Sequence, residues 1–347
     1  MEARKTDQSK LPWNAVPRRR ASDWLMYKLR LPVAIASVIC SLTYVNAGYA
    51  VPATSPAVAK KPFNGRKQGL TIRVEGGGWG VRKETIETVL YSVADELMAR
   101  LPKKLSAPIV VTHTDTNPIA LYERGTEGEY LVHLHAKGDD WQFYVYEFAH
   151  ELCHILSNYE ENIGADTTKY NQWFEETLCE TASLYTLKNL ANTWEKSPPA
   201  PEWSAEAWRL RRFYDLLINE GHRKLPPHSP LATWLHDNEE VLKQDPYLRQ
   251  KNEVVANLLL PLFETSPENW DSLTYLNLNP GDARASLDQY LNHWYQNAPQ
   301  EHKEFISRVL SLLWQGDKPQ PAAPVIASDE SVGAAGTPGE GNPPESR

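Results

Sequence analysis

Residues 148–156 read FAHELCHIL. Apolar residues recur here at helical spacing, which predicts a buried helix over about residues 140–157. Residues four apart lie on the same face of a helix. His150 and His154 can therefore direct ring nitrogens at one metal ion, and Glu151, about 100° further round, can reach a water molecule held by that ion. Histidines that are merely hydrogen-bonded in a core are the alternative interpretation.

A third ligand is expected on the next predicted helix, over about residues 171–190. This helix contains WFEETLCE at residues 173–180, in which Glu176 and Glu180 again lie four apart. We expect Glu176 to bind the metal and Glu180 to accept a hydrogen bond from a ligand histidine. Glu175 points about 100° away and is the lower-ranked ligand. A solvated acidic helix face is the alternative for this cluster.

These segments resemble the gluzincin metallopeptidases, which include thermolysin and the zinc aminopeptidases. HELCH at residues 150–154 matches the H-E-x-x-H motif, and WFEETLCE is similar to the family's W-x-N-E-G-x-x-x-E/D segment. Glu175 replaces the usual Asn and Thr177 replaces a small residue, but neither change removes a ligand. The resemblance implies one Zn²⁺ per chain with these roles: metal ligands His150, His154 and Glu176, general base Glu151, and outer carboxylate Glu180.

The chain around these helices predicts an α+β fold, in which a zincin-like motif domain with a small mixed or antiparallel sheet and an active-site helix precedes a helical C-terminal domain. Strands are expected over residues 70–75, 107–112, 119–123 and 129–136, and an amphipathic helix over 83–101. Helices are expected from 202 to 313, with breaks at Pro226-Pro227, Pro246 and Pro280. The predicted segments are an N-terminal extension and signal peptide (1–50), a linker (51–66), the zincin-like domain (67–200), the helical domain (201–315) and a disordered tail (316–347).

The segment before the motif helix predicts how a substrate is held. In gluzincins an antiparallel edge strand at this place binds the substrate backbone by strand addition. The resemblance assigns that strand to Ile119, Ala120 and Leu121. The Gly-x-Met-Glu-Asn segment by which zinc aminopeptidases recognise a free N-terminus is missing here, which favours an endopeptidase over an aminopeptidase.

The sequence thus predicts a zinc metallopeptidase that hydrolyses a peptide or protein substrate through a zinc-bound water activated by Glu151. Two alternatives stay open: a catalytically silent, zinc-stabilised scaffold or binding protein, and a zinc hydrolase of a non-peptide amide such as a cell-wall linkage. The family stabilises the oxyanion with a Tyr or His from downstream helices. Spacing does not choose among Tyr185, Tyr214, His222, His228, His236 and Tyr275.

Charge and hydropathy indicate export. The first fifty residues hold eight basic and three acidic side chains, so the net charge of −8 divides into +5 there and −13 on the remainder. The acidic remainder argues against nucleic acid as a partner. The short apolar run at residues 31–45 follows basic residues and is typical of a signal peptide, starting near Met26 and cleaved near Ala50. We expect a periplasmic or secreted protein that touches a membrane only if this segment stays uncleaved.

Two further pairs have ordinary and functional interpretations. Cys153 and Cys179 each precede a site residue, so an inter-helix disulfide is one outcome. Two buried free thiols are slightly favoured. His133 and His135 share one face of a strand, where we expect a less buried surface rather than a second metal site.

Overall fold

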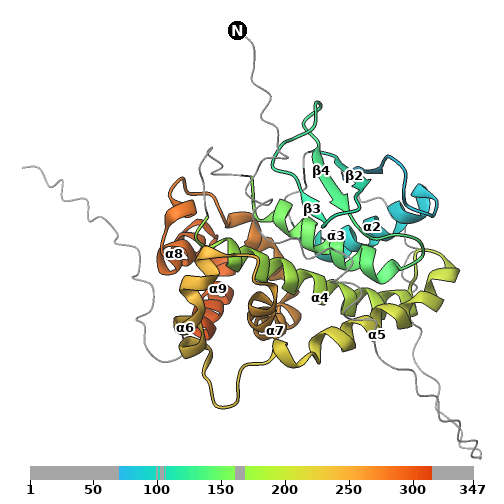
Figure 1. Ribbon diagram of the computed structural model, residues 1–347. Helices are drawn as coiled ribbons and strands as arrows, with labels where there is room; N and C mark the ends of the chain where they lie inside the picture. The colour runs from blue at the N-terminus through green and yellow to red at the C-terminus, as the bar shows by residue number, and fades with distance from the viewer. Residues whose placement is uncertain (1–69, 99–100, 102–104, 106, 161–168, 315–347) are drawn as a thin grey trace, which may run out of the picture.

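The computed structural model describes residues 70–98, 101, 105, 107–160 and 169–314. The predicted signal peptide (1–50), linker (51–66) and tail (316–347) lie outside these described residues. The described part is a mixed α+β structure in which one small sheet packs against a larger set of helices (Figure 1). Among the described residues no helix is both long enough and apolar enough to cross a membrane.

The sheet has four strands in the order β1-β2-β4-β3. They are β1 (Ile72–Val74), β2 (Ile109–His113), β3 (Ile119–Ala120) and β4 (Tyr130–Leu134). β1, β2 and β4 run parallel, while β3 pairs antiparallel with β4. The sheet is therefore mixed, with β3 at one edge. β3 is shorter than predicted, because the chain bends at Tyr122 and Glu123.

Two long helices cross beneath the sheet and carry the predicted motifs (Figure 1). α3 (Trp141–Leu156) and α4 (Gln172–Lys196) pack against each other over much of their length. Both are buried on nearly all sides, as expected of helices whose apolar residues are not confined to one stripe. α4 extends six residues beyond the predicted end at Leu190. α2 (Lys83–Met98) buries one apolar face against α3.

The rest of the described chain is helical, as predicted. Its elements are α5 (Ala207–Ile218), the 3-10 helix η4 (Gly221–Arg223), α6 (Leu231–Gln244), α7 (Arg249–Thr265), α8 (Leu287–Asn297) and α9 (Gln300–Leu313), with shorter 3-10 helices at Pro201–Glu206, Pro267–Tyr275 and Asp282–Arg284. The predicted breaks at Pro226-Pro227, Pro246 and Pro280 all fall between helices. α4 packs against α2 and α3 on one side and α5 and α7 on the other. One continuous core of buried apolar side chains thus joins both halves.

A buried carboxylate fastens α3 to the end of β4. Glu147 Oε2 accepts hydrogen bonds from the backbone N–H groups of His135 (2.8 Å) and Ala136 (2.9 Å), while its Oε1 is buried without a partner. Burial raises the pKa of Glu147 to about 7, although the two backbone hydrogen bonds oppose the rise. The folded protein therefore prefers Glu147 protonated.

This shift predicts a specific pH dependence of stability. Because the folded pKa lies above the unfolded value, the stabilising contribution of Glu147 is present below pH 4.5 and is lost as pH rises through about 7. Between pH 5 and pH 8.5 we expect the wild-type free energy of unfolding to fall by about 2–3 kcal/mol relative to Glu147→Gln, which cannot ionise. Urea unfolding at several pH values measures the difference, and parallel curves for the two proteins would contradict it.

Candidate metal centre

Two histidines on successive turns of α3 form one side of the centre. The ring centroids of His150 and His154 are 5.1 Å apart, with the ring planes at 66°. His154 is buried and His150 is nearly so, with 15% of its side chain exposed. The four-residue spacing thus places both imidazoles on the same face of the helix, as the sequence predicts.

Glu176 on α4 faces both rings. Its Oε2 lies 3.1 Å from His150 Nε2, and its Oε1 lies 3.5 Å from His154 Nε2. Burial raises the pKa of Glu176, but the two histidines outweigh it and hold the value at about 2. Burial lowers the pKa of His154, but Glu176 and Glu175 raise it to about 10. The three side chains are therefore strongly coupled by charge across the helix pair.

Glu175, which the sequence analysis ranks below Glu176 as a metal ligand, makes the histidine contact that was expected of Glu180. His154 Nδ1 lies 2.7 Å from Glu175 Oε1, so this carboxylate can fix the tautomer that leaves Nε2 facing Glu176. The other oxygen of Glu175 accepts a hydrogen bond from Asn277 Nδ2 at 3.1 Å. Burial raises the pKa of Glu175, but Lys169 and His154 lower it below its usual value. The residue next to Glu176 is thus held as an anion behind the histidine.

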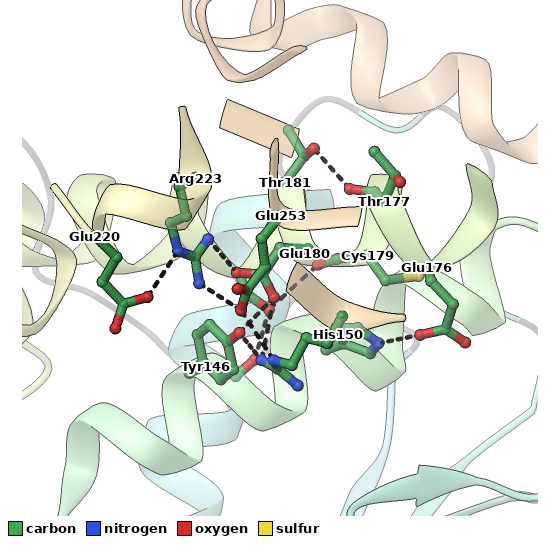
Figure 2. Close-up of polar contacts among 12 residues, drawn as sticks. Tyr146, His150, Glu176, Thr177, Cys179, Glu180, Thr181, Glu220, Arg223 and Glu253 are labelled. Carbon is green, nitrogen blue, oxygen red and sulfur yellow. Dashed lines mark hydrogen bonds and ion pairs between the residues drawn. The ribbon is translucent and has the colours of Figure 1, made fainter. Parts of the chain in front are cut away.

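Glu180 contacts neither histidine by hydrogen bond, which corrects the sequence-based expectation for its partner. Arg223 Nη1 donates to its Oε1 at 2.8 Å, and Tyr146 and Arg249 contact its Oε2. Figure 2 shows Glu180, Arg223 and Tyr146 on the far side of His150 from Glu176. Burial raises the pKa of Glu180, but Arg223 and Arg249 lower it to about 2. The correction has a physical cause: the two arginines come from η4 and α7 and provide the opposite charge that this carboxylate needs.

Glu151 is also buried, with only 4% of its surface exposed. Its Oε2 accepts a hydrogen bond of 2.7 Å from the backbone N–H of Ala120 on β3. On the opposite side of the strand, the N–H of Leu121 pairs with Leu131 on β4. The outer edge of β3 therefore faces the centre. Burial raises the pKa of Glu151, even though both neighbouring histidines lower it.

Two tyrosines that the sequence did not single out lie near the candidate ligands. Tyr122 follows β3, and Tyr247 lies in the turn before α7. Burial and then the charges of Glu175 and Glu176 raise the pKa of the Tyr122 hydroxyl. The pKa of the Tyr247 hydroxyl is also raised, first by burial and then by the charges of Glu176, Tyr122 and Glu175. Both residues nevertheless expose more than a third of their surface, at 36% and 43%.

The six residues considered as oxyanion donors have other surroundings. Tyr185 packs on Trp270, Tyr214 lies beside Lys188, His222 pairs with Glu253, Tyr275 lies beside His302, and His228 and His236 are exposed. The proline break at Pro246 is the one sequence signal that could have drawn attention to Tyr247, because chain turns between helices often carry site residues.

Both cysteines are buried and free, in line with the favoured expectation. His135 stacks on His113, with ring centroids 6.4 Å apart, and its Nδ1 lies 3.2 Å from the carbonyl oxygen of Thr114. Within the described residues, His133 and His135 belong to no group of three potential ligands. Such a group does form from Glu220, His222 and Glu253, but Arg223 already pairs with both of its carboxylates.

Comparison of this chain with protein-family models, with curated proteins and with solved structures finds no match. The resemblance to gluzincins therefore depends on the two sequence motifs alone.

The position of Glu175 predicts its effect on metal binding. We expect Glu175→Gln to weaken zinc binding by about 10–100-fold, because the neutral amide polarises His154 less than the carboxylate does. Glu195→Gln, an exposed change on the same helix, is the matched control and should bind zinc like wild type. Competition with a chromogenic chelator measures both affinities. Equal affinities for the two variants would assign Glu175 a purely structural role.

Proposed function

We propose that this protein is an exported zinc-dependent metallopeptidase. The observation that supports the proposal most strongly is the convergence of His150, His154 and Glu176 from two helices, beside a buried Glu151. Two imidazole nitrogens and one carboxylate are the donors of many catalytic zinc sites. The contact of Glu175 with the outer nitrogen of His154 adds the supporting carboxylate that such sites commonly have.

The residues present fit a zinc ion by the chemistry of their donors. His150, His154 and Glu176 would hold it: one carboxylate oxygen of Glu176 lies 3.1 Å from His150 Nε2, and the other lies 3.5 Å from His154 Nε2. A zinc ion bound there would supply Lewis acidity, which lowers the pKa of water and polarises a carbonyl group. The negative charge of Glu176 is now balanced by the two histidines. A bound cation could take over that balance while the histidines bind it as neutral ligands.

Glu151 is the proposed general base and acid. It would accept a proton from the attacking water and later donate it to the leaving amine. One of its oxygens is held by the N–H of Ala120, so the other remains to carry the proton. Burial, which raises its pKa, makes it a better proton donor in the second step than a surface glutamate would be.

The outer edge of β3 is the proposed substrate-binding strand. Ala120 directs its N–H toward Glu151 rather than toward β4, so the outer edge of Ile119, Ala120 and Leu121 lies beside the proposed base. With that N–H occupied by Glu151, we propose that an extended peptide pairs along the outer side of this strand through the groups that Glu151 leaves free. This arrangement favours a peptide or protein substrate, with an endopeptidase preferred over an aminopeptidase. The silent scaffold and the hydrolase of a non-peptide amide remain as alternatives that activity measurements separate.

The first experiment tests the role of Glu151 as the general base. Glu151→Gln should keep stoichiometric zinc, because the three ligands are intact, and should lose cleavage of a diverse peptide mixture by about 10²–10⁴-fold. Mass spectrometry of the peptides and metal analysis of both proteins give the two readouts. Full zinc with equal cleavage in wild type and variant would be fatal to the peptidase proposal. Cleavage of a non-peptide amide alone would favour the second alternative.

Tyr247 is the proposed donor to the oxyanion, because it is partly exposed and because burial and then the charges of groups that include Glu176 and Glu175 raise the pKa of its hydroxyl. Tyr122 is the alternative donor, since the same two glutamates raise its pKa after burial does. Tyr247→Phe should lower kcat by about 10²-fold with zinc content unchanged. Tyr295→Phe on α8, whose ring lies under Lys303, is the matched control. If Tyr122→Phe gives the loss and Tyr247→Phe does not, the role belongs to Tyr122.

A further inference from the structure

A fourth potential ligand lies at the same centre. A ring nitrogen of His150, a ring nitrogen of His154 and the Sγ atom of Cys179 all lie within 4.8 Å of one another. Cys179 stands on α4 three residues after Glu176, so it presents its side chain on nearly the same face of the helix. Figure 2 places its sulfur atom between His150 and Glu176 in projection. It is fully buried, so the sulfur lies on the protein side of the two imidazoles.

The number of protein ligands separates two kinds of zinc site. Catalytic sites have three protein ligands and leave one position for water, whereas structural sites have four and are closed. Sulfur is moreover a ligand that zinc binds readily, because the ion is intermediate in softness. A buried thiol beside two histidines and a carboxylate is therefore a candidate metal ligand, whereas a buried thiol in an apolar core is not.

We propose that Cys179 is a fourth protein ligand of the metal and competes with water for the reactive position, so that it lowers the activity of the wild-type protein without abolishing it. The proposal rests on the zinc site of the proposed function and adds a way in which that site is regulated. His150, His154 and Cys179 form one group of potential ligands, and Glu176 contacts both histidines. A zinc ion held by all four would leave no position for water until the sulfur is displaced. The thiol proton is released to solvent when the sulfur binds the metal.

The distances allow this with small movements. In a tetrahedral zinc site, bonds of about 2.0–2.1 Å to nitrogen and about 2.3 Å to sulfur place nitrogen and sulfur about 3.6 Å apart. The limit of 4.8 Å within which the three atoms now lie differs from that by about 1 Å, which side-chain rotation can supply. The contacts of Glu176 with the two histidines, at 3.1 and 3.5 Å, already lie in the required range.

Cys153 provides a matched control. It is also a buried free cysteine, and it lies on α3 directly before His154. The two thiols are neighbours: burial, and then the contact with Cys153, raise the pKa of Cys179. Cys153 is nevertheless not part of the group of potential ligands around the two histidines. Replacing either cysteine by serine makes the same chemical change at a buried helical position, but only one of the changes removes the proposed ligand.

Cobalt substitution tests the proposal without relying on activity. The full chain, freed of metal, is titrated with Co²⁺ under reducing conditions while its absorption spectrum is followed. We expect a near-ultraviolet sulfur-to-cobalt charge-transfer band in wild type and in Cys153→Ser. Cys179→Ser should lose this band, keep the visible cobalt bands of histidine ligation, bind zinc at least about 10-fold more weakly, and cleave peptides at least about 10-fold faster than wild type.

The outcomes separate this proposal from the proposed function. Visible cobalt bands without a charge-transfer band in wild type would overturn the role of Cys179 and leave a His, His, Glu site intact. A charge-transfer band that disappears in Cys153→Ser and survives in Cys179→Ser would overturn it as well. Failure of wild type to bind cobalt or zinc at all would refute the proposed function itself. Because the wild-type spectrum is informative alone, a variant that does not fold cannot leave the role of Cys179 undecided.

Discussion

The packing of α3 against α4 buries opposite charges face to face, and the arrangement of the centre depends on that contact. Transferring a carboxylate from water into a protein costs several kcal/mol unless a partner compensates it. Along α4, Glu175, Glu176 and Glu180 are all placed in the interface or beside it. Each therefore requires a partner, and the partner that each finds determines what it can do.

The three carboxylates lie within six residues but have three different environments. Glu176 faces two imidazoles, Glu175 faces the outer nitrogen of one of them, and Glu180 faces two arginines. Only Glu176 has counter-charges that are themselves potential metal ligands. A cation would thus replace an existing interaction at Glu176, whereas at Glu180 it would have to displace two permanent positive charges. The same residue type on one helix is divided in this way between a proposed ligand, an acceptor that contacts a histidine and a structural ion pair.

Much of this arrangement was predictable from local spacing. The periodic apolar residues identified α3 and α4, and the spacing of four placed His150 above His154. What local spacing could not predict was the partner of each carboxylate. Glu175 has the histidine contact that was expected of Glu180. Glu180 instead pairs with Arg223 and Arg249, which lie 43 and 69 residues beyond it in the sequence. Tyr247 was missed as a site residue for the same reason, since its position relative to α4 depends on how helices distant in sequence pack. Cys179 was considered only as a disulfide partner or a buried free thiol, although its spacing of three from Glu176 places it on nearly the same face of α4.

The helical second half is consequently part of the centre and not only a neighbour of it. Arg223 is fully buried and joins Glu180 on α4 to Glu253 on α7, while Arg249 contacts both Glu180 and Tyr146 on α3. Removing one partner of such a buried network leaves an uncompensated charge, at a cost of about 3–5 kcal/mol. α4 would then lose the anchor that fixes its rotation about its own axis. Because Glu175, Glu176 and Cys179 project from that helix within five residues, even a modest rotation of α4 would change which of them faces the two histidines.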